Sequence, residues 1–124
     1  NVIALAVYRG KIVAVDSGRR LLIADPGDLS RFEVRPFPAE WGDAPRKALL
    51  PTPDGRLFLL LERMIAELDP KTFEPRPVAR CPEKLTISAG GAVQDGALYF
   101  GCETRVGRWR YAPSATEKES GNLK

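Results

Sequence analysis

The stretch Asp54-Gly55-Arg56-Leu57-Phe58-Leu59-Leu60 carries the pattern that predicts the fold of this 124-residue chain. It joins a tight-turn signal to an apolar run of strand length. The same arrangement recurs at Gly10, which precedes residues 11–15, and at Gly96, which precedes residues 97–100. The three glycines stand about 43 residues apart, so the chain contains an internal repeat.

A second marker repeats with the same period. Pro26 follows Ala24-Asp25, Pro70 follows Leu68-Asp69 and Pro113 follows Tyr111-Ala112, again at intervals of about 43 residues. Two independent markers with this period predict four short strands per unit, the organisation of a β-propeller blade. We therefore expect an all-β chain with about three four-stranded antiparallel blades that form an incomplete ring.

The repeat also predicts the domain organisation. We expect a propeller segment over residues 1–112, with units at about 1–40, 41–83 and 84–112, and a polar tail over residues 113–124. The third unit lacks a fourth strand, and its first strand is rich in small residues. The expected strands are 2–7, 12–15, 21–24 and 32–37, then 47–50, 57–61, 65–68 and 74–79, and finally 86–93, 98–100 and 106–111.

One segment has a competing interpretation. Residues 57–68 are apolar, free of proline and contain good helix formers, so propensity alone permits a helix. The corresponding places in the other units carry glycine or β-rich sequence. Because a repeat should repeat its structure, we expect a hairpin here.

Propellers close with four to eight blades, and this chain supplies just under three. An open ring would leave an apolar packing face exposed at each end, which repeat units cannot bury alone. We expect completion by a second copy, which would give a twofold six-bladed ring, by a separate chain, or by a severed part of the same gene product. The missing initial Met and the missing fourth strand favour the last of these.

The amino-acid composition excludes several classes of catalytic and metal-binding site. The chain has no histidine, which excludes Ser-His-Asp and Cys-His catalysis and histidine metal sites within it. The carboxylates lie mostly in turns, where aspartate usually caps its own backbone. We expect no catalytic residue, cofactor or metal site in this chain, and these absences argue against an enzyme.

Charge and cysteine content bear on partners and compartment. The net charge of +3 is mild and the basic residues are scattered, which argues against nucleic-acid binding. No apolar run has the length of a membrane helix. Cys81 and Cys102 lie near strand ends, where free cysteine packs as a small apolar residue. We expect two reduced thiols and hence a cytoplasmic protein.

Trp41 and Arg46 are the candidate binding residues. They lie in the long connection between the first two units, where an exposed tryptophan beside an arginine could anchor a protein partner or a sugar ring. The alternative is that Trp41 packs over the edge of a unit. Trp109 alternates with Arg108 and Arg110, so we expect it to point into the core.

Two segment pairs carry a resemblance to known repeats. Residues 54–58 with 65–72, and residues 95–101 with 107–111, resemble the second and third strands of kelch-like, NHL-like and quinoprotein-like propeller blades. The Gly-His and Trp-Asp signatures of WD40 repeats are absent. The resemblance implies an architecture and carries no functional residue over to this chain.

The function expected from these features is a non-enzymatic scaffold for protein interaction. A carbohydrate-binding propeller is an alternative, but it would repeat aromatic and acidic residues in every unit. A second alternative is a fragment of a propeller enzyme whose catalytic residues lie on absent blades. Fold-level analogy does not decide among them.

Overall fold

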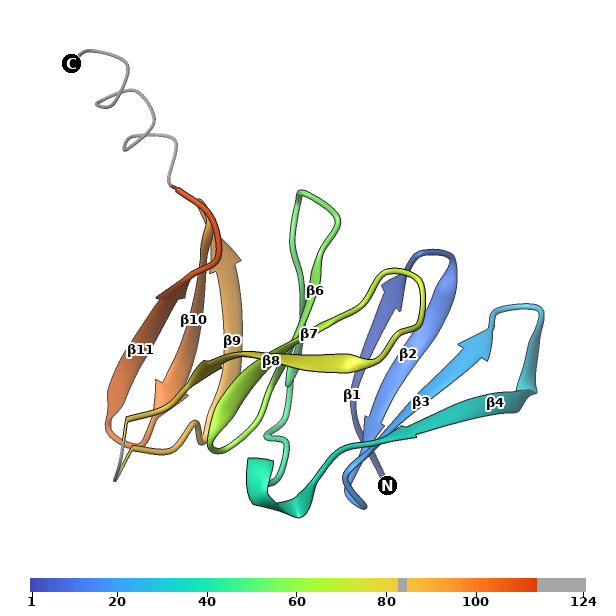
Figure 1. Ribbon diagram of the computed structural model, residues 1–124, viewed down its shortest axis with the longest axis horizontal. Helices are drawn as coiled ribbons and strands as arrows, with labels where there is room; N and C mark the ends of the chain where they lie inside the picture. The colour runs from blue at the N-terminus through green and yellow to red at the C-terminus, as the bar shows by residue number, and fades with distance from the viewer. Residues whose placement is uncertain (83–84, 114–124) are drawn as a thin grey trace, which may run out of the picture.

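Eleven β-strands and one 3-10 turn form the structure, a computed structural model that describes residues 1–82 and 85–113. The strands form three separate antiparallel sheets, β1 to β4, β5 to β8 and β9 to β11, called here the first, second and third sheets. Figure 1 shows them standing side by side in chain order. The elements are β1 (Val2–Tyr8), β2 (Lys11–Asp16), β3 (Arg20–Asp25), β4 (Asp28–Pro36), η1 (Ala39–Trp41), β5 (Leu49–Pro51), β6 (Leu57–Leu60), β7 (Met64–Leu68), β8 (Pro75–Arg80), β9 (Ala89–Gln94), β10 (Ala97–Cys102) and β11 (Arg105–Arg110).

The repeated glycines lie in tight turns that require positive φ. Arg9 and Gly10 have φ values of 53° and 77°, and Asp95 and Gly96 have values of 47° and 81°. Two successive positive φ values make a turn whose twist matches that of a two-stranded hairpin. The repeated turn signal in the sequence therefore has a direct backbone cause.

The hairpin expected over residues 57–68 is confirmed. β6 and β7 are antiparallel with Leu60 opposite Ile65, and the Leu61 N–H donates to the Met64 carbonyl at 2.9 Å. Residues 57–61 are all buried, since the second sheet lies between the other two. A strand buried on both faces is apolar at every position, which is why its sequence also suited a helix.

Several strand boundaries differ from the sequence-based expectation. β4 begins at Asp28 and not at residue 32, because its pairing with β3 continues past a register shift between Ala24 and Asp25. β5 begins at Leu49 because Lys47 has a φ of 57°, which does not fit a strand. β9 begins at Ala89 and not at residue 86. The expected tail lies outside the described residues apart from Pro113.

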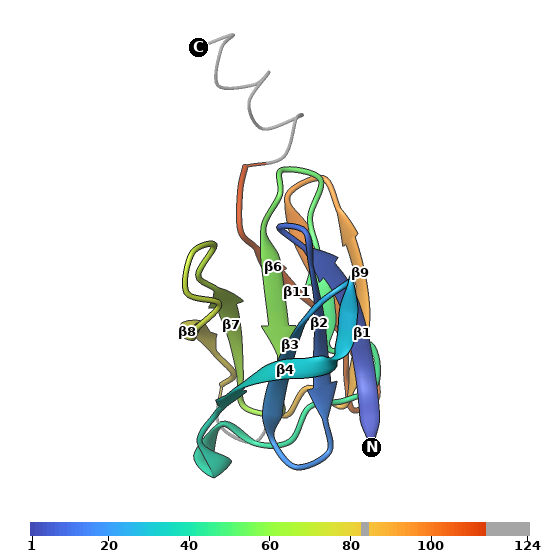
Figure 2. The same ribbon diagram turned by 90° about the vertical axis from the view of Figure 1, so that its right-hand side faces the viewer.

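The first strands of the three sheets lie next to one another. β1 contacts β5, and β5 contacts β9, while the Gly90 N–H donates to the Arg46 carbonyl at 3.0 Å. Figure 2 shows β1 and β9 on one side of the molecule and β8 on the other. The described structure is therefore all-β, and its three sheets share a common inner side without joining into a barrel.

Aromatic side chains form contacts between neighbouring sheets. Between the first and second sheets, the Tyr8 hydroxyl donates to the Leu68 carbonyl at 3.4 Å and the Tyr8 ring meets Phe73 edge-on at 5.4 Å. Between the second and third sheets, Phe58 meets Trp109 edge-on at 5.5 Å. Trp109 is half-buried and packs against the core, as its alternation with arginines predicts.

Candidate functional site

The first sheet has an outward face that no other sheet covers in the described structure. Strand register places two rows of four side chains on this face, because directly opposed residues share a side of the sheet. All eight side chains are apolar, and we call them the outward face. The rows are Leu5, Ala14, Leu22 and Val34, and Val7, Ile12, Ala24 and Phe32.

The outward face is more apolar than the face that packs against the second sheet. Two corresponding rows on the packed face end in charged residues of β4, namely Arg35 and Glu33. On the outward face β4 instead contributes Val34 and Phe32, which are 37% and 53% exposed. Leu5 and Val7 on β1 are 65% and 67% exposed. Monomeric proteins rarely expose a contiguous apolar surface of this kind.

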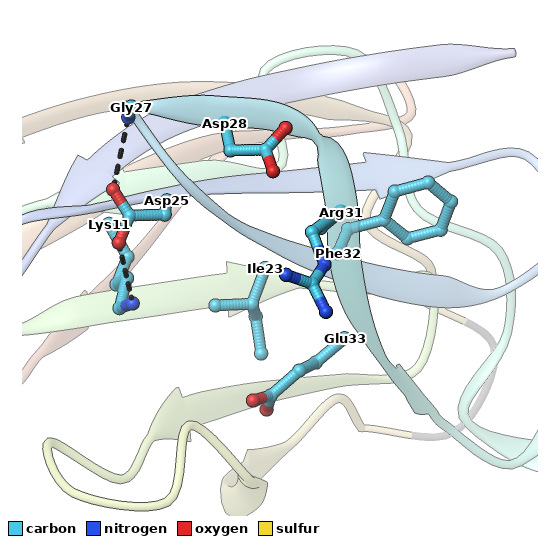
Figure 3. Close-up of a pocket in the computed structure, with 8 residues that line it drawn as sticks. All are labelled: Lys11, Ile23, Asp25, Gly27, Asp28, Arg31, Phe32 and Glu33. Atoms are coloured by element: carbon cyan, nitrogen blue, oxygen red, sulfur yellow. Dashed lines mark hydrogen bonds and ion pairs between the residues drawn. The ribbon is translucent and has the colours of Figure 1, made fainter.

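A charged groove lies at the outer half of the first sheet. Its main cavity has a volume of about 590 Å³ and is lined from β2, β3, β4 and the turn between β3 and β4. Figure 3 shows side chains of both charges around Ile23. The lining residues are Lys11, Ile23, Asp25, Gly27, Asp28, Arg31, Phe32 and Glu33.

Ion pairing and turn geometry account for the groove's central carboxylate. The Gly27 N–H donates to Asp25 Oδ1 at 3.0 Å, and Lys11 Nζ lies 3.5 Å from Asp25 Oδ2. These contacts lower the pKa of Asp25, the Gly27 hydrogen bond being the larger cause. A carboxylate held ionised in this way suits a structural ion pair and is a poor general acid at neutral pH.

The two candidate binding residues occupy different surroundings. Trp41 is half-buried, packs against the core and stacks on Phe37 with ring centres 6.4 Å apart. Arg46 is exposed, and its carbonyl oxygen accepts a hydrogen bond from the Gly90 N–H. Within the described residues, no hydrogen bond or ring contact joins Trp41 to Arg46. A joint binding role for the pair stays a prediction.

The two cysteines are free thiols that line one small apolar pocket. Cys102 is buried and Cys81 is half-buried. Burial raises the pKa of the Cys81 thiol, and the neighbouring Cys102 raises it further. The protonated thiol is a weak nucleophile, so the pocket offers apolar surface and not reactive sulfur.

Sequence reasoning predicted exposed packing faces but did not identify the residues of the outward face. A half-buried strand alternates apolar and polar residues. A strand whose odd and even positions are both apolar therefore indicates that both faces of the sheet are apolar there. β1 shows this signal, since it reads Val-Ile-Ala-Leu-Ala-Val-Tyr. β4 gave a weaker signal because charged residues separate Phe32 and Val34.

Comparison of the chain with models of protein families, with curated proteins and with solved structures finds no match. Among the residues that the structure describes, no group of histidine, cysteine or acidic side chains is arranged to hold a metal ion. The same residues include no helix with the length and apolar character needed to cross a membrane.

Proposed function

We propose that the three sheets are neighbouring blades of a β-propeller and that the protein is a non-enzymatic interaction scaffold. Its outward face packs against another apolar β-sheet. That sheet belongs to a second copy, to a separate chain, or to a further part of the same polypeptide.

The observation that carries this proposal is the composition of the outward face. The face of the first sheet that packs against the second sheet has charged residues on its outer strand, β4. The outward face has no charged residue among its eight paired positions. Exposing apolar surface to water costs about 25 cal/mol of free energy per Å². Packing of the outward face against another apolar sheet would remove this cost, as packing already does between the first and second sheets.

The arrangement of the sheets supports the propeller interpretation. Each sheet is a meander of consecutive antiparallel strands, and the first strands β1, β5 and β9 lie together on one side. A crevice of about 480 Å³ runs along these inner strands between residues 2–5 of β1 and Lys47, Leu49, Leu50 and Gly91. Sheets set around a common inner side are the organisation of propeller blades.

A charge placed on the outward face tests the proposal. Val7→Asp puts a carboxylate on a side chain that is 67% exposed in this structure, so folding of the chain should change little. We expect wild-type protein to self-associate or, as a monomer, to bind a hydrophobic dye. The variant should weaken either property by about tenfold, since about 1.4 kcal/mol corresponds to that factor. Sedimentation and dye fluorescence measure these effects.

Val78→Asp is the matched control. Val78 is an exposed valine on β8, at 39%, and lies outside the outward face. This variant should behave as wild type in both measurements. A wild-type monomer that binds no dye at any concentration would show that the outward face needs no partner.

A further inference from the structure

The third sheet ends one strand earlier than the other two within the described residues. Its order is β11-β10-β9, so β11 is its last strand. At the same position in the first and second sheets, β3 and β7 each pair with a further strand, β4 and β8. Within residues 1–82 and 85–113, the outer edge of β11 is therefore open where its counterparts are paired.

Backbone groups on this edge point away from the sheet. The Tyr111 N–H donates to the Gly96 carbonyl across the β10–β11 hairpin at 3.0 Å. Because hydrogen-bonded and non-hydrogen-bonded pairs alternate in an antiparallel ladder, the N–H and C=O of Val106 and Arg108 point away from β10. No backbone hydrogen bond within residues 1–82 and 85–113 reaches these outward groups.

β11 also lacks the features that prevent further strand pairing at β4 and β8, the outer strands of the first and second sheets. β8 contains Pro75 and Pro77, β4 ends at Pro36, and both strands pair with a register shift. Proline and bulges on an edge block further strand pairing. β11 has no proline and pairs with β10 over six residues without a shift, which is the character of an interior strand.

An apolar pocket lies beside this edge, between the second and third sheets. Its volume is about 210 Å³, below the roughly 300–1,000 Å³ of sites for drug-sized molecules. The pocket therefore suits a single apolar side chain. Its lining is Ile65, Ala79, Arg80, Cys81, Pro82, Leu85, Phe100, Cys102, Gly107, Arg108 and Trp109.

The opposite side of β11 carries positive charge. Arg108 lies opposite Tyr99 in the ladder, on the other face of the strand from Trp109. Arg108 is exposed, and no ion pair found within the described residues involves it. A neighbouring strand would be stabilised by acidic residues on this face, because opposite charges on adjacent strands attract.

The geometry points to a strand-addition site at β11 for an extended segment of a partner protein that alternates acidic and apolar residues. The segment forms backbone hydrogen bonds with Val106 and Arg108. Its acidic side chains lie beside Arg108, and one apolar side chain enters the pocket next to Trp109. The site goes beyond the proposed function and is independent of it, since it does not use the outward face of the first sheet.

An octapeptide of alternating glutamate and valine, titrated into the full chain and followed by NMR, tests the site. We expect shifts along β11 and slower amide exchange at Val106 and Arg108. An octapeptide of alternating lysine and valine should bind about tenfold more weakly. Equal affinity for the two peptides, or shifts confined to other strands, would overturn the inference. So would amides of Val106 and Arg108 already protected without peptide.

Substitutions at Arg108 and Val106 separate the effect of charge from that of backbone pairing. Arg108→Glu should reverse the preference between the acidic and basic peptides. Val106→Pro removes an outward N–H and should abolish binding, while Val106→Thr keeps the N–H and should bind as wild type. If the proline variant does not fold, N-methylation of the peptide at alternate residues tests the same hydrogen bonds, and unchanged affinity in both methylation registers would contradict them.

The matched comparison with the first sheet keeps the two proposals distinct. Val7→Asp should leave peptide binding unchanged, because Val7 lies on the outward face of the first sheet. Loss of peptide binding in this variant would contradict a site confined to β11. Peptide binding that survives in a protein with no self-association or dye binding would remove the proposed function and leave the strand-addition site intact.

Discussion

At the residue scale, Gly90 shows how closely the inner strands approach. A Cβ atom on Gly90 would lie 1.9 Å from the Lys47 carbonyl oxygen. Since backbone atoms cannot move aside cheaply, we expect Gly90→Ala to lower the free energy of unfolding by about 3 kcal/mol. Urea denaturation measures this change.

Gly27→Ala is the control for that substitution. Gly27 lies in an exposed turn, and the nearest atom to an added Cβ is Asp25 Oδ1 at 3.5 Å. Its free energy of unfolding should change by less than about 0.5 kcal/mol. Equal effects of the two substitutions would mean that β9 does not approach the chain before β5 as closely as the structure has it.

At the scale of elements, Arg56 joins the second sheet to the end of the third. Its Nε and Nη2 donate to the two carboxylate oxygens of Glu67 at 3.0 and 2.9 Å, and Nη1 donates to the Tyr111 carbonyl at 3.2 Å. The guanidinium also lies over the Phe58 and Tyr111 rings, with its carbon 5.0 and 5.2 Å from the ring centres. Hydrogen bonding to Glu67 is the main cause that raises the pKa of Arg56.

We expect Arg56→Lys to lower the free energy of unfolding by about 1–2 kcal/mol, because lysine cannot form the two-pronged contact or the flat stacking. Thermal or urea denaturation measures the loss. Arg76→Lys is the matched control, since Arg76 is 63% exposed and lies 3.8 Å from Asp69, and exposed pairs contribute little. An Arg56→Lys protein as stable as this control would show that Arg56 does not hold the two sheets together.

At the scale of the whole molecule, stability should depend on pH through carboxylates that the fold keeps ionised. Burial raises the pKa of Asp16, but hydrogen bonds from Arg20 and the Gly18 N–H outweigh it, and the pKa lies below its ordinary value. The pKa values of Asp25 and Asp69 are also lowered, chiefly by backbone N–H groups in their turns.

A pKa lower in the folded state than in the unfolded state, about 3.9 for aspartate, means that the unfolded chain binds more protons as the pH falls. The contribution of these groups is therefore complete at neutral pH, declines from about pH 5, and is lost through the lower folded pKa values. Urea midpoints between pH 7 and pH 3 measure this. Asp16→Asn should show a shallower decline, and an unchanged decline would assign the acid sensitivity to other groups.

The all-β class, the positions of the turns and the hairpin over residues 57–68 could be predicted from local sequence alone. It could do so because a turn with positive φ and a short apolar run are local requirements, met by a few neighbouring residues such as Asp95 and Gly96. Strand ends were less well predicted, since β5 begins only after Lys47, which adopts positive φ, and β4 extends past a register shift.

Which apolar residues are covered depends instead on the packing of the three sheets. Phe32 and Val34 look like ordinary strand residues in sequence, yet they complete an exposed surface because strand register aligns them with Val7 and Leu5 three strands away. The contact of Trp109 with Phe58 and the open edge of β11 depend likewise on residues distant in the chain. Burial and edge exposure are properties of how sheets are placed against each other, and no local pattern of residues contains that placement.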